Sequence, residues 1–559
     1  MKKVFALFLA AMLLACTACG GSAGSTGSTG TADPGDSVAS GGSGNTSTPA
    51  GDETPRQGGE IVVGLSYEPD TMNVYSTHLL GDVQAMVVEG LLVPNSEMEY
   101  VPVLAKEVPT VENGGIVMDE TAGTMDVTYH LRDDVQWHCG EKFTAADVVA
   151  TWEALCDPNW EAESKDGASD IDSIEAPDDY TVICHYNTII PDFAQTLFTF
   201  GIMPAHDIAG KDMNDPNNGY NNTPCGTGPY VFSEWVSGEY IKLTRNDNYY
   251  GDNGPYLDSV TVRFVVDENT RINMLKSGEI DFTYGISFAN YDQVKDLPGC
   301  TAIVHGLNSW RYFDMNHNVP GLDDVNVRRA IACAIDKEAL VNQLFSGIPQ
   351  AWDQPWMPSD PFHVEGFKSE WSFDMDKANK LLDDAGWVMG SDGVRAKDGV
   401  RLEFTVICRS GTATDGFIAQ VITSYLSQVG IKINTEEYAS STWSAKMYDG
   451  DYELGIGGYI TSPGATRTKM YAIGGALNRG GWENQAFTDL CAKIDKELDA
   501  EARKAQVAEA LTYFDSELPQ IVIYANNEII VVNEKLRGFS PNPTNMTNFC
   551  QSAGWWLAE

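Results

Sequence analysis

One long stretch of the chain, residues 454–482, contains side chains suited to binding but no carboxylate. It reads LGIGGYITSPGATRTKMYAIGGALNRGGW. With 79 acidic residues among 559, a window of this length should hold roughly four acids. Tyr459 offers a stacking face, and the hydroxyls of Thr461 and Ser462 offer neutral hydrogen-bond donors and acceptors. These residue types suit a neutral polar ligand, such as a sugar or a blocked peptide.

The same stretch carries three cationic side chains, Arg467, Lys469 and Arg479. Clustered cations can bind an anionic ligand. They can equally form ion pairs with an acidic body from a glycine-rich surface loop. The sequence leaves both interpretations open.

The chain shows no pattern typical of catalysis or of a metal centre. Neither a G-x-S-x-G nor an H-E-x-x-H sequence occurs. The nine cysteines after residue 19 form no C-x-x-C pair, and the eight histidines do not cluster along the chain. We expect most of these cysteines to be buried thiols, and His138 to be a hydrogen-bonded scaffold residue. The sequence therefore predicts no enzyme, no metal site and no cofactor.

Composition bounds the class of protein. A chain of 559 residues exceeds one hydrophobic core, so two or three domains are expected. The formal net charge is −43, which argues against nucleic acid as a partner because phosphate binding needs clustered lysine and arginine.

The N-terminus predicts export and attachment to a membrane. Two lysines, the apolar run VFALFLAAMLLA and small residues are typical of a signal peptide in residues 1–19. LLAC resembles a bacterial lipobox, with cleavage and lipidation at Cys16, or alternatively at Cys19. Residues 20–57 are rich in Gly, Ser, Thr and Pro and predict a flexible tether. The expected location is extracytoplasmic, on the outer face of the cell membrane or in the periplasm.

The folded part alternates strand and helix patterns, which predicts a mixed α/β fold. Residues 58–66 read as a buried strand, and residues 126–137 alternate as a strand does. Thr144 and Asp147 form a capping-box pattern before a helix. Residues 226–251 predict a hairpin. Further helices are expected within 267–278, 326–347 (two helices) and 374–386, and further strands within 391–407 and 518–532.

Several stretches together resemble family 5 of the bacterial extracellular solute-binding proteins, the oligopeptide-, dipeptide- and nickel-binding receptors of ABC importers. They follow the family's order along nearly the whole body. They read GGEIVVGLSYEPDTMN, YHLRDDVQWHCGEKFTAADVVATWEAL, GTGPYVFSEW, LTRNDNYYG, LDSVTVRFVVDENTRINMLKSGEIDF, DVNVRRAIACAIDKEALV and KLLDDAGW.

The resemblance implies a two-lobed fold of the periplasmic-binding-protein type (type II, cluster C), with an extra domain in lobe I. Lobe I would combine residues 58–96, 223–304 and 530–559, with the extra domain at 97–222 and lobe II at 305–529. Hinge crossings would lie near His305-Gly306 and near residues 528–532. Such a receptor makes and breaks no covalent bond. Its ligand binds the closed form better and so shifts the population toward that form.

The resemblance also implies where the ligand binds. In the peptide-binding members, an Asp in the loop after the strand matching YELGIGGYI grips the α-ammonium of the peptide. Here the loop reads Tyr459-Ile460-Thr461-Ser462-Pro463-Gly464, with hydroxyls in place of the acid. The predicted ligand-binding residues are Tyr459, Thr461, Ser462, Trp310, Asn316, Trp356, Tyr67, Arg409 and Ser410.

We therefore expect a monomeric solute-binding receptor of an ABC import system, with a permease and ATPase subunits as partners and a lipid at its N-terminus. Peptides are the family's usual ligand. Because the acid is missing, an oligosaccharide is the alternative. A surface lipoprotein that senses its ligand without transport is a further alternative.

Overall fold

The computed structural model describes residues 54–559, apart from 80, 196, 411–412 and 545–547. The predicted signal peptide, both candidate lipidation sites (Cys16 and Cys19) and residues 20–53 of the predicted tether lie outside the described residues. No helix in the part of the chain that the structure describes has the length and apolar character to cross a bilayer.

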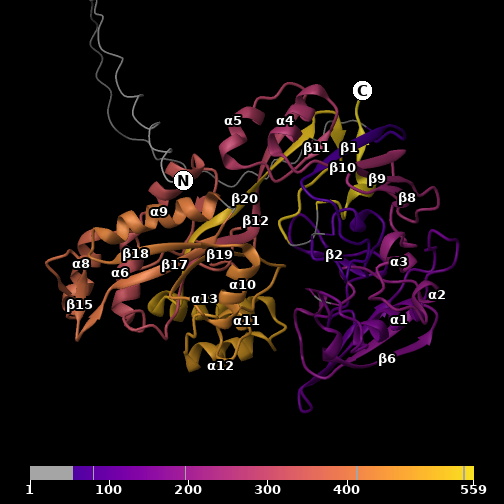
Figure 1. Ribbon diagram of the computed structural model, residues 1–559. Coiled ribbons are helices and arrows are strands. Elements are labelled where there is room, and N and C mark those ends of the chain that lie inside the picture. The colour runs from indigo at the N-terminus through magenta and orange to yellow at the C-terminus, as the bar shows by residue number, and fades with distance from the viewer. Residues whose placement is uncertain (1–53, 80, 196, 411–412, 545–547) are drawn as a thin grey trace, which may run out of the picture. The chain divides into compact units, whose positions relative to one another are not determined.

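A mixed sheet of 11 strands dominates the fold (Figure 1). Its two longest strands, β12 (Cys300–Met315) and β20 (Gln520–Asn533), lie side by side and antiparallel at its centre. On the side of β12 the order continues through β19 (Leu454–Ile460), β17 (Glu403–Arg409) and β18 (Lys432–Tyr438). On the side of β20 it continues through β11 (Phe282–Thr283), β1 (Glu60–Leu65), β10 (Ser259–Phe264), β9 (Tyr240–Arg245) and β8 (Tyr230–Val236). The short β13 (Gln350–Ala351) also pairs with β20.

The pairing of β12 with β20 has two irregularities near the middle of the two strands, a longer interruption between Gly306 and Trp310 and a register shift between Arg311 and Tyr312. It runs regularly from Cys300 opposite Asn533 to Gly306 opposite Asn527, and resumes with Trp310 opposite Ala525. The interruption begins at one of the two predicted crossings, His305-Gly306. A bulge of this kind bends a strand and locally increases its twist.

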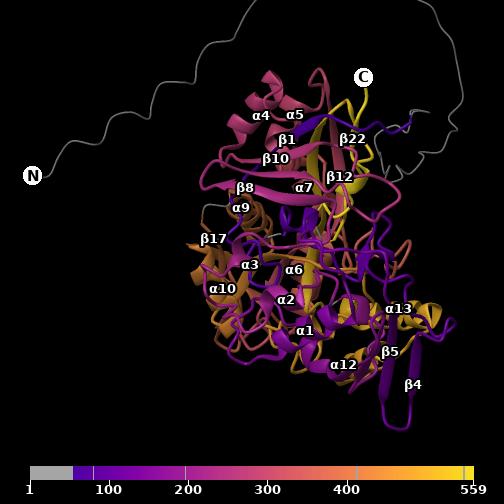
Figure 2. The ribbon, with the colours of Figure 1, turned by 90° about the vertical axis from the view of Figure 1, so that its right-hand side faces the viewer.

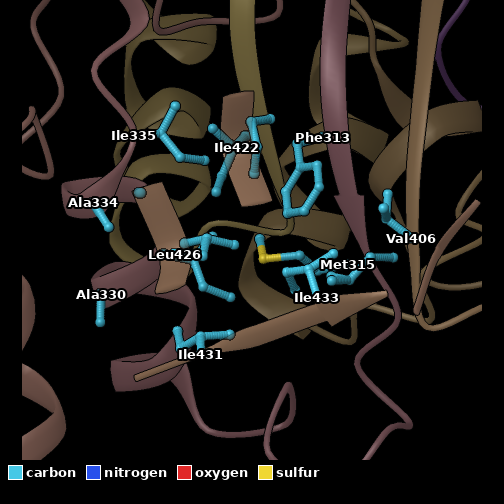
Figure 3. Packing of buried hydrophobic residues seen from close by; sticks show 14 of the residues in the cluster. Phe313, Met315, Ala330, Ala334, Ile335, Val406, Ile422, Leu426, Ile431 and Ile433 are labelled. Carbon is cyan, nitrogen blue, oxygen red and sulfur yellow. The ribbon is translucent and has the colours of Figure 1, made fainter. Parts of the chain in front are cut away.

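Helices cover the half of the sheet that contains β17, β18 and β19. They are α6 (Val325–Ala334), α7 (Lys337–Phe345), α8 (Met375–Asp384), α9 (Ala413–Ser427), α10 (Ser440–Asp449), α11 (Thr468–Tyr471), α12 (Gln485–Ile494) and α13 (Ala500–Glu517). Figure 3 shows part of the core beneath them, where Phe313 and Met315 of β12 lie among aliphatic side chains that include Ile422 and Leu426 of α9. The buried members of this core and of a second, aromatic-rich one all fall within residues 310–525.

A separate four-stranded sheet belongs to residues 116–186. Its order is β4 (Ile116–Asp119), β5 (Thr124–His130), β7 (Thr181–Tyr186) and β6 (Ile171–Asp178), and β4 and β5 form the hairpin seen in Figure 2. Helix α1 (Ala145–Cys156) packs on this sheet and begins with the predicted capping box, since Thr144 and Asp147 exchange both hydrogen bonds. The buried members of this core come from residues 75–220.

Most predicted elements are present. The strand pattern predicted over 126–137 is shorter than expected, because β5 ends at His130. The hairpin β8–β9 and helix α4 (Glu268–Ser277) are present, and α4 begins at its Asp267 cap and ends at left-handed Gly278. Helix α7 ends at Phe345, two residues before the predicted stop at Gly347, because Ser346 already adopts the left-handed conformation. The expectation that most cysteines are buried is wrong, because only four of the nine described ones are buried. All nine are free thiols.

Candidate ligand site

Tyr459 lies in an aromatic group built by neighbouring strands. In the β12–β19 pairing it stands directly opposite Trp310. Its ring centroid is 5.4 Å from that of Trp310 and 4.9 Å from that of Tyr312. A Cβ at Gly457 would lie 2.3 Å from the Tyr312 hydroxyl, so the glycine makes room for that ring. Tyr459 is half-buried, and burial raises the pKa of its phenol to about 12.

The loop that follows Tyr459 is fastened to β12 through a single buried asparagine. Asn308 accepts the backbone N–H of Thr461 at its carbonyl (2.9 Å), and its amide donates to the carbonyls of Thr461 (3.2 Å) and Ser462 (3.1 Å). The hydroxyl oxygen of Thr461 and the amide oxygen of Asn308 have no hydrogen-bond partner among the described residues. Backbone anchoring of this kind fixes the loop while it leaves the threonine hydroxyl uncommitted.

The cations of the acid-free stretch serve different purposes. Arg467 is buried and pairs with the buried Asp360, with Nη2 3.0 Å from Oδ2. Lys469 makes a solvent-exposed pair with Asp166 at 3.7 Å. The guanidinium of Arg479 lies 4.0 Å from the ring centroid of Tyr448 and 5.7 Å from that of Tyr459. The interpretation that the cations pair with the acidic body is thus confirmed for Arg467 and Lys469, whereas Arg479 adds a cation beside Tyr459.

Two of the predicted aromatic contacts are core residues in the described conformation. Trp310 is 0% exposed and Trp356 is 1% exposed. The indole of Trp310 donates to Gln520 (3.4 Å), and that of Trp356 donates to the carbonyl of Ala465 (3.1 Å). The guanidinium of Arg467 lies 5.7 Å and 5.2 Å from the two rings. These tryptophans support the loop and Tyr459 from beneath, and a ligand in this conformation would reach Tyr459 first.

Asn316 lies at a different place. Its amide donates to the carbonyls of Gly450 (3.0 Å) and Tyr452 (2.8 Å). It contributes to the wall of a cavity of about 500 Å³ that Tyr438 and Lys446 also line. This cavity contains none of Tyr459, Thr461 and Ser462.

Arg409 and Ser410 lie at the end of β17. The guanidinium of Arg409 donates to Asp415 (2.9 Å) and lies 5.0 Å from the ring centroid of Trp443. Arg311 also pairs with Asp415, which is fully buried. The exposed Ser410 donates its backbone N–H to the carbonyl of Tyr438 (2.7 Å). Arg409 is thus already held by an ion pair.

Tyr67 belongs to a hydrogen-bonded group far along the sheet, near β1 and β11. Its hydroxyl and that of Tyr284 both donate to the buried Asp82. Burial raises the pKa of the Asp82 carboxyl to about 6 and that of nearby Glu528 to about 7. The structure therefore gathers Tyr459, Thr461, Ser462, Trp310 and Trp356, while Asn316, Arg409 with Ser410, and Tyr67 lie outside this group.

Sequence reasoning missed several members of the Tyr459 group, namely Asn308, Tyr312, Asp360 and Tyr448. Asn308 and Tyr312 flank Trp310 at two-residue spacing, the period of a strand, and this spacing was the available signal. Asp360 lies 107 residues from Arg467, so no local pattern pairs them.

The strands β12 and β20 contribute to two separate hydrophobic cores, one that contains Phe313 and Ile521 and one that contains Ile303 and Ile530. With the aromatic and hydroxyl group at the end of β19, this is the architecture expected for a two-lobed ligand-binding receptor. Comparison with known proteins agrees. Residues 99–481 match the model of the bacterial extracellular solute-binding proteins, family 5.

The chain is 26% identical over 540 residues to the oligopeptide-binding protein AppA of Bacillus subtilis, covering 94% of this chain and 96% of that protein. It is 31% identical over 401 residues to protein XP55 of Streptomyces lividans, covering 68% of this chain and 67% of that protein. The solved structure of B. subtilis AppA in complex with a nonapeptide superposes with a TM-score of 0.73 at 24% identity, covering 90% of this chain and 100% of that one.

The chain belongs to family 5 of the bacterial extracellular solute-binding proteins and has the two-lobed α/β fold of that family. It is an extracytoplasmic solute-binding receptor of an ABC importer, and it is not an enzyme. The predictions of family, fold and general function are confirmed.

Proposed function

We propose that this receptor is anchored by a lipid at Cys16, or alternatively at Cys19, and captures a peptide or another polar solute at Tyr459, Thr461 and Ser462. It passes the solute to the permease, whose ATPase subunits drive import. The receptor works as a monomer. The similarity to oligopeptide-binding AppA supports a peptide as the default ligand.

The observation that carries the ligand class is the way the acid-free loop is built. Its buried cation, Arg467, is already neutralised by Asp360 and adds no net charge for a ligand, whereas Arg479 remains a cation beside Tyr459 and would repel an ammonium group. The loop carries the half-buried Tyr459 and the Thr461 hydroxyl, which is buried and has no hydrogen-bond partner among the described residues. A ring face beside neutral hydroxyls favours a neutral segment of ligand over a free ammonium group. We therefore expect a blocked or internal peptide segment, or an oligosaccharide.

The lobes proposed to close are residues 58–96, 223–304 and 530–559 on one side, with the extra domain 97–222, and residues 305–529 on the other. Separate hydrophobic cores within 75–220 and within 310–525 support this division. The interrupted pairing between Gly306 and Trp310 supports a hinge there, because unpaired residues can change their backbone angles at small cost.

A binding screen of the full chain tests the ligand class. It compares short peptides with free amino termini, the same peptides acetylated, and oligosaccharides, each by thermal shift and calorimetry. A ligand at 100 times its Kd stabilises the folded form by about 2.7 kcal/mol, which raises the melting temperature measurably. Binding of the acetylated peptides or of the sugars supports the proposal. Binding of free-amino peptides alone would overturn it.

Substitution of Tyr459 tests the site itself. Tyr459→Ala removes the stacking face and should weaken binding of the identified ligand about fivefold or more, since a lost aromatic contact is worth roughly 1 kcal/mol or more. The matched control is Tyr240→Ala, because Tyr240 is also partly exposed but lies in the β8–β9 hairpin. Equal affinity of the Tyr459→Ala variant and the control for the ligand would remove Tyr459 from the site.

A further inference from the structure

Three side chains with metal-binding atoms converge in the region of α1, although they are far apart in the sequence. They are Cys139, His206 and Cys225, and their ligand atoms all lie within 4.8 Å of one another. Cys139 Sγ is 3.3 Å from His206 Nε2. Cys139 and His206 are exposed and Cys225 is half-buried, so an ion can reach them from solvent.

The spacing matches the edge of a small coordination polyhedron. With Zn–S bonds of about 2.3 Å and Zn–N bonds of about 2.0–2.1 Å, tetrahedral geometry places sulfur and nitrogen about 3.6 Å apart. The observed Cys139–His206 separation of 3.3 Å differs from this by about 0.3 Å. Two sulfurs and one imidazole nitrogen form a ligand set that prefers zinc among the common divalent cations.

A buried carboxylate fixes two of the three ligand-bearing segments relative to each other. Asp147 accepts the indole N–H of Trp137 (3.2 Å), two residues before Cys139. It also accepts the backbone N–H of Ala205 (2.8 Å), the residue before His206 in helix α2 (Ala205–Ile208). The short α2 and helix α1, which carries Asp147, pack against each other (Figure 1).

The third segment is held by the histidine next to Cys139. The ring of His138 accepts the backbone N–H of Gly226 at Nδ1 (3.3 Å) and therefore donates from Nε2 to the carbonyl of Gly228 (2.9 Å). Its backbone N–H donates to the carbonyl of Gly226 (2.8 Å). The backbone N–H of Cys139 donates to Cys225 Sγ at 3.3 Å, a contact that stabilises a thiolate. His138 is thus the scaffold residue that the sequence predicted, and it positions Cys225.

We propose that Cys139, His206 and Cys225 bind one thiophilic divalent cation, with Zn²⁺ as the natural choice and a water molecule in the fourth position. On binding, the two thiols release their protons to solvent and coordinate as thiolates, while neutral His206 coordinates through Nε2. The ion would tie the segment before β8 to α2 and to the turn at Cys139. This site is separate from the Tyr459 group, so it is independent of the ligand proposed above.

The test uses the full chain, reduced and freed of metal with a chelator. Zn²⁺ affinity is measured by competition with a chromophoric chelator, and Co²⁺ is added separately as a spectroscopic probe for thiolate-to-metal charge transfer. We expect one equivalent of Zn²⁺ to bind and Co²⁺ to give the charge-transfer band. Cys139→Ser, Cys225→Ser and His206→Ala should each weaken Zn²⁺ binding at least about 100-fold, because loss of a direct ligand exceeds the 10–100-fold cost of a second-shell change.

The matched control is Cys156→Ser, since Cys156 is another exposed thiol, at the end of α1. It should retain the affinity of the unaltered chain. Absence of the charge-transfer band, or equal affinity in the control and the three ligand variants, overturns the proposal. A Cys139–Cys225 disulfide in protein never exposed to reductant, together with no Zn²⁺ binding after reduction, would also overturn it and assign the pair to a disulfide.

Discussion

Removal of the buried cation of the acid-free loop should destabilise the domain that carries it. Arg467 donates to Asp360 and also to the carbonyls of Pro355 (3.0 Å), Gly464 (3.0 Å) and Thr466 (2.9 Å). In the Arg467→Met variant these acceptors lose their donor, and the fully buried Asp360 keeps an uncompensated charge or takes up a proton. Breaking one side of a buried pair costs about 3–5 kcal/mol. We expect a loss of that size in the free energy of unfolding.

The same stretch provides the control. Lys469→Met removes an equal charge, but the side chains of Lys469 and Asp166 are 73% and 67% exposed. An exposed pair contributes about 0–1 kcal/mol, so this variant should be close to the unaltered chain. Urea unfolding followed by tryptophan fluorescence suits the comparison, because Trp310 and Trp356 lie beside Arg467.

A second substitution separates lost charge pairing from lost packing. Asp360→Asn in the Arg467→Met background removes the orphaned charge while its side-chain oxygen can still accept the backbone N–H of Phe362 (2.9 Å). The double variant should therefore be more stable than Arg467→Met alone. A loss below about 1 kcal/mol for Arg467→Met, or equal losses for Arg467→Met and Lys469→Met, would refute the reasoning.

Three further predictions concern other parts of the molecule. Burial raises the folded pKa of Asp82 from 3.8 to about 6, so its contribution to stability is fully present below pH 3.8 and is lost as the pH rises through 6. The unfolding free energy of the unaltered chain, relative to that of Asp82→Asn, should fall by up to about 3 kcal/mol between pH 4 and 8. If urea titrations show the same difference between the two chains at both pH values, the prediction is wrong. Gly226→Ala should lower the free energy of unfolding by more than about 2 kcal/mol, because the new Cβ would lie 1.8 Å from the carbonyl oxygen of Val87. Unchanged stability in thermal or urea unfolding would show that the backbone of this turn can shift to accommodate the Cβ. Thr144→Ala should cost about 1 kcal/mol through loss of the capping box with Asp147, and an unchanged urea midpoint would count against that capping role.

Local patterns in the sequence predicted most of the fold. Caps such as Asp267 and Thr144 satisfy orphan backbone N–H groups within one turn, so helix starts can be predicted from a few residues. The pairing of β12 with β20 was harder to predict, because it joins residues 300–315 to residues 520–533. Register over that separation follows from tertiary packing. The resemblance to a family implied only two crossings, near His305-Gly306 and near residues 528–532, and no register.

The candidate site was predicted less completely for the same physical reason. Tyr459 and Thr461 were found because their residue types and their loop are local features. The burial of Trp310 and Trp356 could not be predicted, since the core around them is built from residues far apart in the sequence. The cluster of Cys139, His206 and Cys225 was missed because ligands that approach only in space leave no spacing pattern.

The engaged carboxylates near the loop bear directly on which ligand the receptor takes. Asp360 is fully buried and committed to Arg467. Asp314 is 5% exposed and accepts a hydrogen bond from Tyr452 (3.2 Å), and burial raises the pKa of its carboxyl to about 6. A free ammonium group would need a charged, accessible carboxylate, and neither acid supplies one without breaking an existing contact. Substituting an acid into the loop as Thr461→Asp should therefore create affinity for free-amino peptides and weaken affinity for their acetylated forms. Calorimetry with both peptide series decides the matter, and the reverse preference in the variant would show that the ammonium site lies elsewhere.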